Sequence, residues 1–115
     1  MIGKPGRHAP AFVLLMIAEK SCYGLEIYNQ LSERLPHSLL DTAAVYKALS
    51  KLEEKNCIQF EWDTTAPGPP KKMYTLTKCG RDALEQFYED INFRRQNLDF
   101  FMKTYQKIER MEDNE

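Results

Sequence analysis

The sequence predicts a mostly helical α+β fold, in which a small domain ending in a β-hairpin is followed by one long helix. Apolar residues recur at helical spacing in the segments before residue 56. The spacing then changes from 3.6 residues to 2 around a proline-rich stretch, and a final segment of more than thirty residues has no proline. A chain of 115 residues with 43% hydrophobic side chains has room for one such domain and an appended helix.

The first helix is expected from about Pro10 to Lys20, because proline is tolerated in a first helical turn. The side chains of this helix are apolar on nearly every side, so we expect it to be buried at a domain or subunit interface. Phe12 is expected at the subunit interface. The apolar run from Ala9 to Ala18 is too short to span a bilayer, and charged residues follow it where a signal peptide would need a cleavage site. These observations predict a cytoplasmic protein without a membrane segment.

Two further helices are expected next. The second runs from about Gly24 to Leu35, and its inward face is predicted to carry Leu25, Tyr28, Leu31 and Leu35. Asp41 is expected to cap the third, from Thr42 to about Lys55, because its carboxylate can accept unpaired N–H groups of the first turn. The inward residues of this third helix are predicted to be Val45, Ala48, Leu49 and Leu52, and Asn56 is expected to end it in the left-handed region.

Alternation of apolar and polar residues from Ile58 to Asp63 predicts a strand with one buried face, and Met73 to Thr77 predicts a second. The proline-rich segment between them makes the pair a hairpin. We interpret Trp62, the single tryptophan, as packing in the core or the hairpin.

The last helix is expected to start after a Thr77 cap and to run from Lys78 to about Met111. At 1.5 Å per residue it would be about 50 Å long, so a domain this small cannot bury its far end. Its apolar stripe therefore predicts a homodimer, with an interface formed by Leu84, Phe87, Ile91, Leu98, Phe101, Tyr105 and Ile108. Arg94 interrupts the stripe and either pairs with an acidic residue such as Asp90 of the partner helix or extends past the seam.

Three helices followed by strand, wing and strand are the element order of a winged helix-turn-helix. We expect a flexible basic arm over residues 1–8, the winged-helix domain over 9–77, a dimerisation helix over 78–112 and a tail over 113–115. In this shape the third helix fits the major groove of DNA, and the hairpin loop reaches phosphates. The residues predicted to contact double-stranded DNA are Lys4, Arg7, Thr42, Tyr46, Lys47, Lys51, Lys71 and Lys72.

The charge balance leaves alternatives open. The net charge is −1; residues 1–77 carry nine basic and eight acidic side chains, a balance of +1, and residues 78–115 carry seven and nine, a balance of −2. The lysine row on the third helix could be an ordinary solvated face, and Tyr46 could contact phosphate or pack beneath the wing. A winged-helix module that binds a protein and no DNA is the alternative function.

Five motifs in register resemble the PadR family of transcriptional regulators: Tyr23–Ile27, Val45–Glu53, Glu61–Trp62, Gly68–Thr77 and Gly80–Arg81. The resemblance covers about residues 8–90 and implies a homodimeric repressor that binds a pseudo-palindromic operator and is often released by a small ligand. It places Tyr46 on the recognition helix and Lys71, Lys72 and Tyr74 in the wing. Ala44 and Lys47 stand where the family usually has threonine and proline, so we expect DNA contacts that differ from those of relatives.

Aromatic residues near the expected seam are candidates for a pocket that takes a small hydrophobic or aromatic effector, namely Phe93, Phe100 and Phe101; packing is their alternative role. The three cysteines match no metal motif and are interpreted as reduced thiols, so no metal site and no cofactor are expected. No catalytic constellation or phosphate loop is present in the sequence, which argues against an enzyme.

Overall fold

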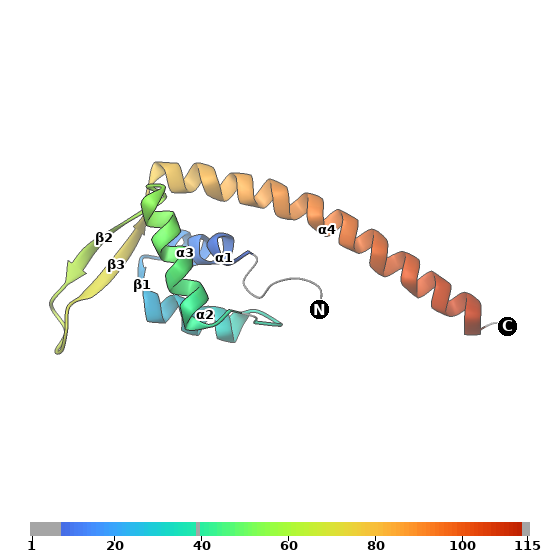
Figure 1. Cartoon of the computed structure of the whole chain (residues 1–115), viewed down its shortest axis with the longest axis horizontal. Coiled ribbons are helices and arrows are strands. Elements are labelled where there is room, and N and C mark those ends of the chain that lie inside the picture. Colours follow the sequence, from blue (N-terminus) through green and yellow to red (C-terminus); the bar gives the residue numbers. More distant parts are fainter. Residues whose placement is uncertain (1–7, 39, 114–115) are drawn as a thin grey trace. The chain divides into compact units, whose positions relative to one another are not determined.

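The computed structural model of the chain describes residues 8–38 and 40–113. Its elements confirm the predicted α+β class and meet the expected bounds to within two residues (Figure 1). They are α1 (Ala9–Glu19), β1 (Cys22–Tyr23), α2 (Gly24–Arg34), α3 (Thr42–Glu54), β2 (Ile58–Asp63), β3 (Lys71–Leu76) and α4 (Lys78–Asp113). Contacts divide the chain into two compact units, one ending at Leu84 and one beginning at Glu85, so α4 belongs partly to each.

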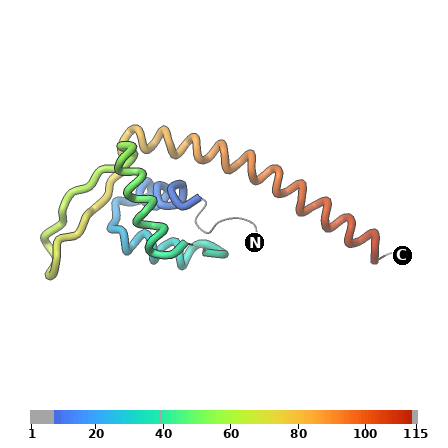
Figure 2. The backbone as a smooth tube through the Cα atoms, viewed as in Figure 1, coloured from blue at the N-terminus to red at the C-terminus, as the bar shows by residue number. Residues whose placement is uncertain are grey.

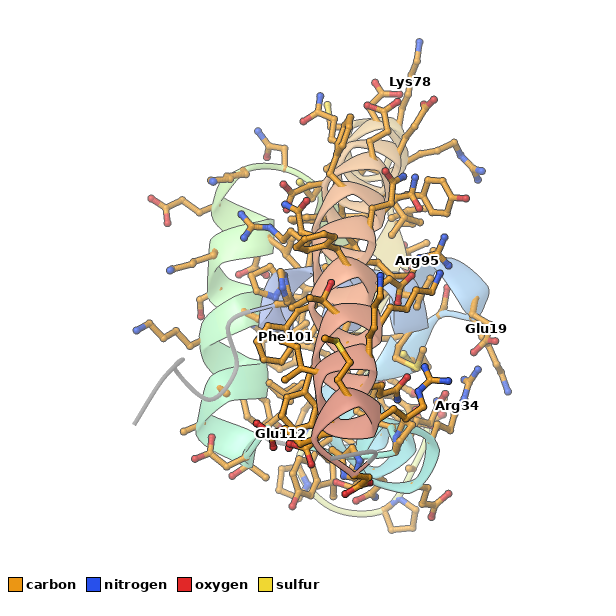
Figure 3. The ribbon with its side chains drawn as sticks, turned by 90° about the vertical axis from the view of Figure 1, so that its right-hand side faces the viewer. Glu19, Arg34, Lys78, Arg95, Phe101 and Glu112 are labelled. Carbon is orange, nitrogen blue, oxygen red and sulfur yellow. The ribbon has the colours of Figure 1, made fainter. Side chains whose placement is uncertain are left out.

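Helix α1 lies in the core of the first unit, where it packs against α2, α3 and β3. Val13 and Leu14 have no exposed surface, whereas Phe12 is half-buried and Leu15 is 45% exposed. An ion pair ties α1 to α2 at the domain surface: the Arg34 guanidinium donates to both Glu19 carboxylate oxygens, at 2.5 and 3.1 Å (Figure 3). The nearly uniform apolar character of α1 is thus explained by neighbours on several sides.

The inward face of α2 differs from the prediction. Ile27 and Leu31 are buried, but Leu25 is 56% exposed, and Tyr28 and Leu35 are only half-buried. Residues 24, 27 and 31 have the same three-and-four spacing as residues 25, 28, 31 and 35, so periodicity alone is compatible with both faces. The burial of Ile27 and close packing at Gly24 select the face that the structure adopts.

Helix α3 begins and ends as predicted. The Asp41 carboxylate accepts a hydrogen bond from the backbone N–H of Ala44 at 2.7 Å, which confirms the N-cap. Asn56 has a φ of 60°, the left-handed conformation that asparagine tolerates after a helix. All four residues predicted to point inward are buried, namely Val45, Ala48, Leu49 and Leu52. This leaves the opposite side of α3 exposed.

The β-sheet has three strands, in the antiparallel order β1-β3-β2, whereas the sequence predicted only the hairpin. Cys22 and Tyr23 form the additional short strand and pair with Tyr74 and Met73. Figure 2 follows the chain from β2 through the turn into β3, and Figure 1 shows this hairpin extending beyond the three helices. Strand β1 thereby joins the base of the hairpin to the start of α2.

The first turn of α4 is anchored to the domain. The Thr77 hydroxyl accepts from the backbone N–H of Gly80 at 3.0 Å, which confirms the predicted cap, and donates to the carbonyl of Asn56 at 2.6 Å. A side chain at Gly80 would place its Cβ 2.0 Å from the carbonyl oxygen of Cys57. Only glycine allows this close approach, so Gly80 sets the contact between α4 and the turn that follows α3.

No residue of the second unit is buried over the described range 85–113. Arg94 donates to Asp90 of the same helix at 2.9 Å, an intrahelical i,i+4 pair that neither predicted role of Arg94 included. Phe101 and Arg95 lie on different sides of α4 (Figure 3). The rings of Phe101 and Tyr105 stack along one side, with centroids 6.4 Å apart.

Candidate nucleic-acid interface

The exposed side of α3 carries the four residues predicted to contact DNA from this helix. Thr42, Tyr46, Lys47 and Lys51 are all solvent-exposed and lie outside the buried stripe that begins at Val45. Tyr46 follows Thr42 by four residues, and Lys51 follows Lys47 by four, so the members of each pair are neighbours on the helix surface. The sequence therefore provides α3 with an apolar stripe for the domain and an exposed surface that carries two of the predicted DNA-contacting lysines.

Lys71 and Lys72 lie on opposite faces of the hairpin, because successive residues of a strand alternate. Lys71 is paired in register with Asp63, and Lys72 is paired with Trp62. The Lys72 ammonium lies 4.1 Å from the ring centroid of Phe60 and 5.6 Å from that of Trp62. The hairpin thus divides the two adjacent cations between two environments.

Lys72 is partly engaged within the domain. Its ammonium is 3.9 Å from the Glu53 carboxylate on α3, a distance that counts as an ion pair but is too long for a hydrogen bond. Its side chain is 35% exposed. Since Glu53 and the aromatic rings already interact with this cation, less of its charge is available to an external anion than that of Lys71.

Lys71 belongs to the other face of the hairpin, beside Tyr23 and Asp63. Its ammonium lies 5.5 Å from the centroid of the Tyr23 ring. Hydrogen bonds from Thr65 and from the Tyr23 hydroxyl lower the pKa of Asp63 to about 2, and the Asp63 bond raises the pKa of Tyr23. No carboxylate among the described residues comes within 4 Å of the Lys71 ammonium, although its charge also contributes to the lowered pKa of Asp63.

A groove of about 510 Å³ lies between the start of α2, Tyr46 of α3 and the hairpin. We call it the hairpin groove; its lining includes Tyr23, Leu25, Tyr46, Trp62, Lys71 and Tyr74. Trp62 is 59% exposed, so the interpretation as a core residue is wrong. It packs edge-on against Phe60 at 5.6 Å, which confirms the alternative, packing within the hairpin.

Sequence reasoning missed the part that Tyr23, Gly24 and Leu25 play in this groove. A side chain at Gly24 would place its Cβ 2.8 Å from Cε1 of Tyr46, so the missing side chain lets the Tyr46 ring lie against the start of α2. Periodicity assigned Leu25 to the core and gave no signal for the short strand at Tyr23. The available signal was a glycine at the first position of an otherwise regular helix.

The other predicted site residues are distributed as follows. Lys4 and Arg7 lie outside the described residues. Phe12, Leu84, Phe87 and Ile91 are half-buried, whereas the later residues of the stripe are 48–65% exposed: Leu98, Phe101, Tyr105 and Ile108. Phe93 and Phe100, two of the three aromatic residues considered for an effector, are 69% and 72% exposed.

The cysteines are free thiols: Cys22 and Cys57 are buried, and Cys79 is exposed. Burial raises the pKa of the Cys22 thiol to about 11. In the described ranges 8–38 and 40–113, no three His, Cys, Asp or Glu side chains gather as metal ligands would. None of the helices in these same ranges has the length and apolar character needed to cross a bilayer.

The three helices, the three-stranded sheet with its hairpin and the long final helix define a winged-helix protein. A profile of the "Transcriptional regulator PadR-like family" matches residues 13–86, well over half of the chain. The chain therefore belongs to the PadR-like family of transcriptional regulators, which confirms the resemblance that its motifs indicated. Because members of this family regulate transcription, the expectation that the chain is not an enzyme is confirmed as well.

Individual relatives agree with this assignment. A PadR family transcription regulator from Clostridium difficile R20291 is 29% identical and has a TM-score of 0.70; the match covers 83% of this chain and 98% of that one. Bacillus subtilis PadR in complex with operator DNA is 26% identical, with a TM-score of 0.65, and the match covers 71% of this chain and 47% of the longer relative. A protein from Lysinibacillus sphaericus, called Uncharacterized protein X, is 28% identical over 97 residues, 84% of this chain and 89% of its own length.

Proposed function

We propose that this chain is a cytoplasmic, homodimeric repressor that binds a pseudo-palindromic operator through α3 and the hairpin. The observation that carries the proposal is the exposed surface of α3, where Thr42, Tyr46, Lys47 and Lys51 lie outside the buried stripe. A helix of this kind fits the major groove, and exposed lysines neutralise phosphates. The Bacillus subtilis relative in complex with operator DNA supports the same use of the fold.

The dimer is proposed from α4. Its second half has large apolar side chains that the described chain leaves exposed, among them Leu98, Phe101 and Tyr105. A contiguous apolar stripe on a long helix is buried most simply by the same stripe of a second copy. In this dimer the two α3 helices would address half-sites about 10 base pairs apart.

The domain boundaries follow from this proposal. Residues 9–77 form the DNA-binding domain and residues 78–112 the dimerisation helix, with a basic arm before them and a short tail after. The arm contributes Lys4 and Arg7 to phosphate contacts. Release by a small hydrophobic or aromatic effector is also proposed, with Phe93, Phe100 and Phe101 near the seam as its contacts.

The proposal is tested by DNA binding measured across salt concentrations, on fragments from the region upstream of the protein's own gene. Each phosphate contact contributes about −0.9 to the logarithmic salt slope. We expect Lys51→Ala and Lys71→Ala each to flatten the slope by about one unit, and Lys72→Ala to flatten it less because Glu53 already engages that cation. Lys20→Ala, an exposed lysine after α1, is the matched control and should leave the slope unchanged.

Two results would count against this function. No binding to any duplex at low salt would favour the alternative of a winged helix that contacts a partner protein. A slope that is the same in Lys51→Ala, Lys71→Ala and wild-type protein would remove α3 and the hairpin from the interface.

A further inference from the structure

The ion pair between Glu53 of α3 and Lys72 of β3 is more buried than the other two ion pairs of the described residues. The side chains of those two pairs are 45–54% exposed, whereas Glu53 is 34% and Lys72 is 35% exposed. The Oε1 atom of Glu53 is shielded from solvent and has no hydrogen-bond partner among residues 8–38 and 40–113. The Lys72 ammonium lies 3.9 Å from this oxygen. A carboxylate oxygen in such a position depends on the neighbouring cation to offset its lost hydration.

The Lys72 ammonium has three neighbours that retain it inside the angle between α3 and the hairpin. It lies 4.1 Å from the ring centroid of Phe60 and 5.6 Å from that of Trp62, in addition to its contact with Glu53. A full opposite charge attracts an ammonium more strongly than the face of an aromatic ring does. Glu53 is therefore the strongest of the three interactions that keep this cation on the α3 side.

A phosphate contact by Lys72 would require its ammonium to leave Glu53. The carboxylate would then be left without its cation beside a buried group, Tyr74. Burial raises the pKa of the Tyr74 hydroxyl and the charge of Glu53 raises it further, so this negative charge already acts on the buried side of the hairpin. Removing the partner of a partly buried charge is unfavourable. The exchange from carboxylate to phosphate thus reduces what Lys72 gains from DNA.

The hairpin does not need this ion pair to keep its place. Strands β2 and β3 are paired in register along their whole length. Phe60 packs against Tyr74 and Trp62, with ring centroids 6.2 and 5.6 Å apart. At 3.9 Å the contact between Glu53 and Lys72 is too long for a hydrogen bond and adds little geometric constraint. Glu53 therefore restrains the charge of Lys72 more than the position of the hairpin.

We propose that Glu53 lowers the DNA affinity of the chain without contacting DNA, by retaining the Lys72 ammonium at α3 and away from phosphate. Glu53 is in this sense a positioning residue that acts through Lys72. Because phosphates are the same in every sequence, it should lower the affinity for all duplexes by the same factor. The effect on DNA rests on the proposed function, whereas the hold of Glu53 on Lys72 does not.

The test is DNA binding by Glu53→Gln, measured across salt concentrations on the full chain. The substitution keeps the shape of the side chain and removes its charge. We expect the Kd to fall by about two- to fivefold and the salt slope to steepen by up to about one unit, as one more phosphate is neutralised. Glu54→Gln is the matched control, because it removes the same charge from an exposed neighbour that forms no ion pair among the described residues. Its effect should be smaller and should leave the slope unchanged.

Lysine substitutions in both backgrounds show whether Glu53 acts through Lys72. Lys72→Ala should flatten the slope by about one unit in Glu53→Gln protein and by less in wild-type protein. Lys71→Ala should have the same effect in both backgrounds. The proposal is overturned if Glu53→Gln weakens binding, as a residue that only supports the fold would, or if Lys72→Ala has equal effects with and without Glu53.

A measurement without DNA separates this proposal from the proposed function. ¹⁵N relaxation of the lysine ammonium groups reports their mobility in the free protein. Glu53→Gln should make the Lys72 ammonium more mobile and leave that of Lys71 unchanged. Equal mobility of Lys72 in both proteins would overturn the hold of Glu53. A protein that shows the difference but binds no duplex would contradict the proposed function and leave the contact between Glu53 and Lys72 standing.

Discussion

The winged-helix domain and the second half of α4 show opposite relations between sequence and burial. In the domain, apolar residues such as Val13, Leu14 and Ile27 have no exposed surface. Beyond Leu84, α4 is equally regular and has apolar residues at similar spacing, yet none of its described residues is buried. Helical periodicity therefore predicts which residues share a face. It does not tell whether that face is covered by the same chain or by another.

The largest expected effect compares two Leu→Ala substitutions. Leu14→Ala should lower the free energy of unfolding by about 3–5 kcal/mol, because it leaves a cavity in a fully buried site. Leu98, which is 65% exposed, should affect stability only through association. Urea unfolding at low and high protein concentration distinguishes them: Leu14→Ala should lower stability at both, and Leu98→Ala only where chains associate. If Leu98→Ala lowered the free energy of unfolding equally at both concentrations, the two regions would not differ in what covers their apolar residues.

The proposed dimer is tested next by introducing a charge into the stripe. Phe101→Glu should weaken association by at least about 2 kcal/mol, or about thirtyfold, because a charge would lie in an apolar seam. Gln96→Glu adds the same charge outside the stripe and should leave association unchanged. Light scattering at micromolar concentration measures both, and a dimeric Phe101→Glu protein would place the seam elsewhere.

Gly80 tests where the domain ends and the exposed part of α4 begins. Gly80→Ala should destabilise the domain by about 1–3 kcal/mol, since its Cβ would meet the backbone carbonyl of Cys57 at 2.0 Å. Cys79→Ala, an exposed neighbour in the same turn, should change stability by less than about 0.5 kcal/mol. Chemical denaturation measures both. A tolerated alanine at Gly80 would show that the start of α4 is not fixed to the domain.

Local chemistry explains what could be predicted from the sequence. The caps at Asp41 and Thr77 and the left-handed Asn56 each depend on residues within a few positions, so they could be identified before the structure. Strand β1 could not, because two residues have no periodicity and this strand exists only through pairing with β3. The prediction of the inward face of α2 was wrong for a related reason. Two overlapping faces of this helix have the same residue spacing, and tertiary contacts select one of them.

The candidate site also combines features that the local sequence predicts with features that depend on tertiary contacts. Exposure of Tyr46, Lys47 and Lys51 followed from their positions outside the buried stripe of α3. The hairpin groove needs the start of α2, one residue of α3 and the hairpin to meet, and these segments are far apart in the sequence. Lys71 and Lys72 were considered as one basic pair, because the predicted strand began only at Met73; in β3 they alternate and lie on opposite faces. Their unequal neighbours became visible only with the positions of Glu53 and Phe60.

The smallest expected effect concerns Asp63 at the end of β2, beside the exposed turn of the hairpin. Its folded pKa of about 2 is below its ordinary value of 3.8, so its contribution to stability is present above about pH 4 and is lost as the pH falls through about 2. Thr65→Ala should raise this pKa most, since the Thr65 hydroxyl is the largest cause, and Tyr23→Phe should raise it less. An NMR titration of the Asp63 carboxyl carbon measures the shifts, with Thr64→Ala as control.

If neither Thr65→Ala nor Tyr23→Phe moves the Asp63 pKa, the link between β1 and the hairpin end is absent in solution. The contrast between the two regions would then be confined to the helical core of the winged-helix domain.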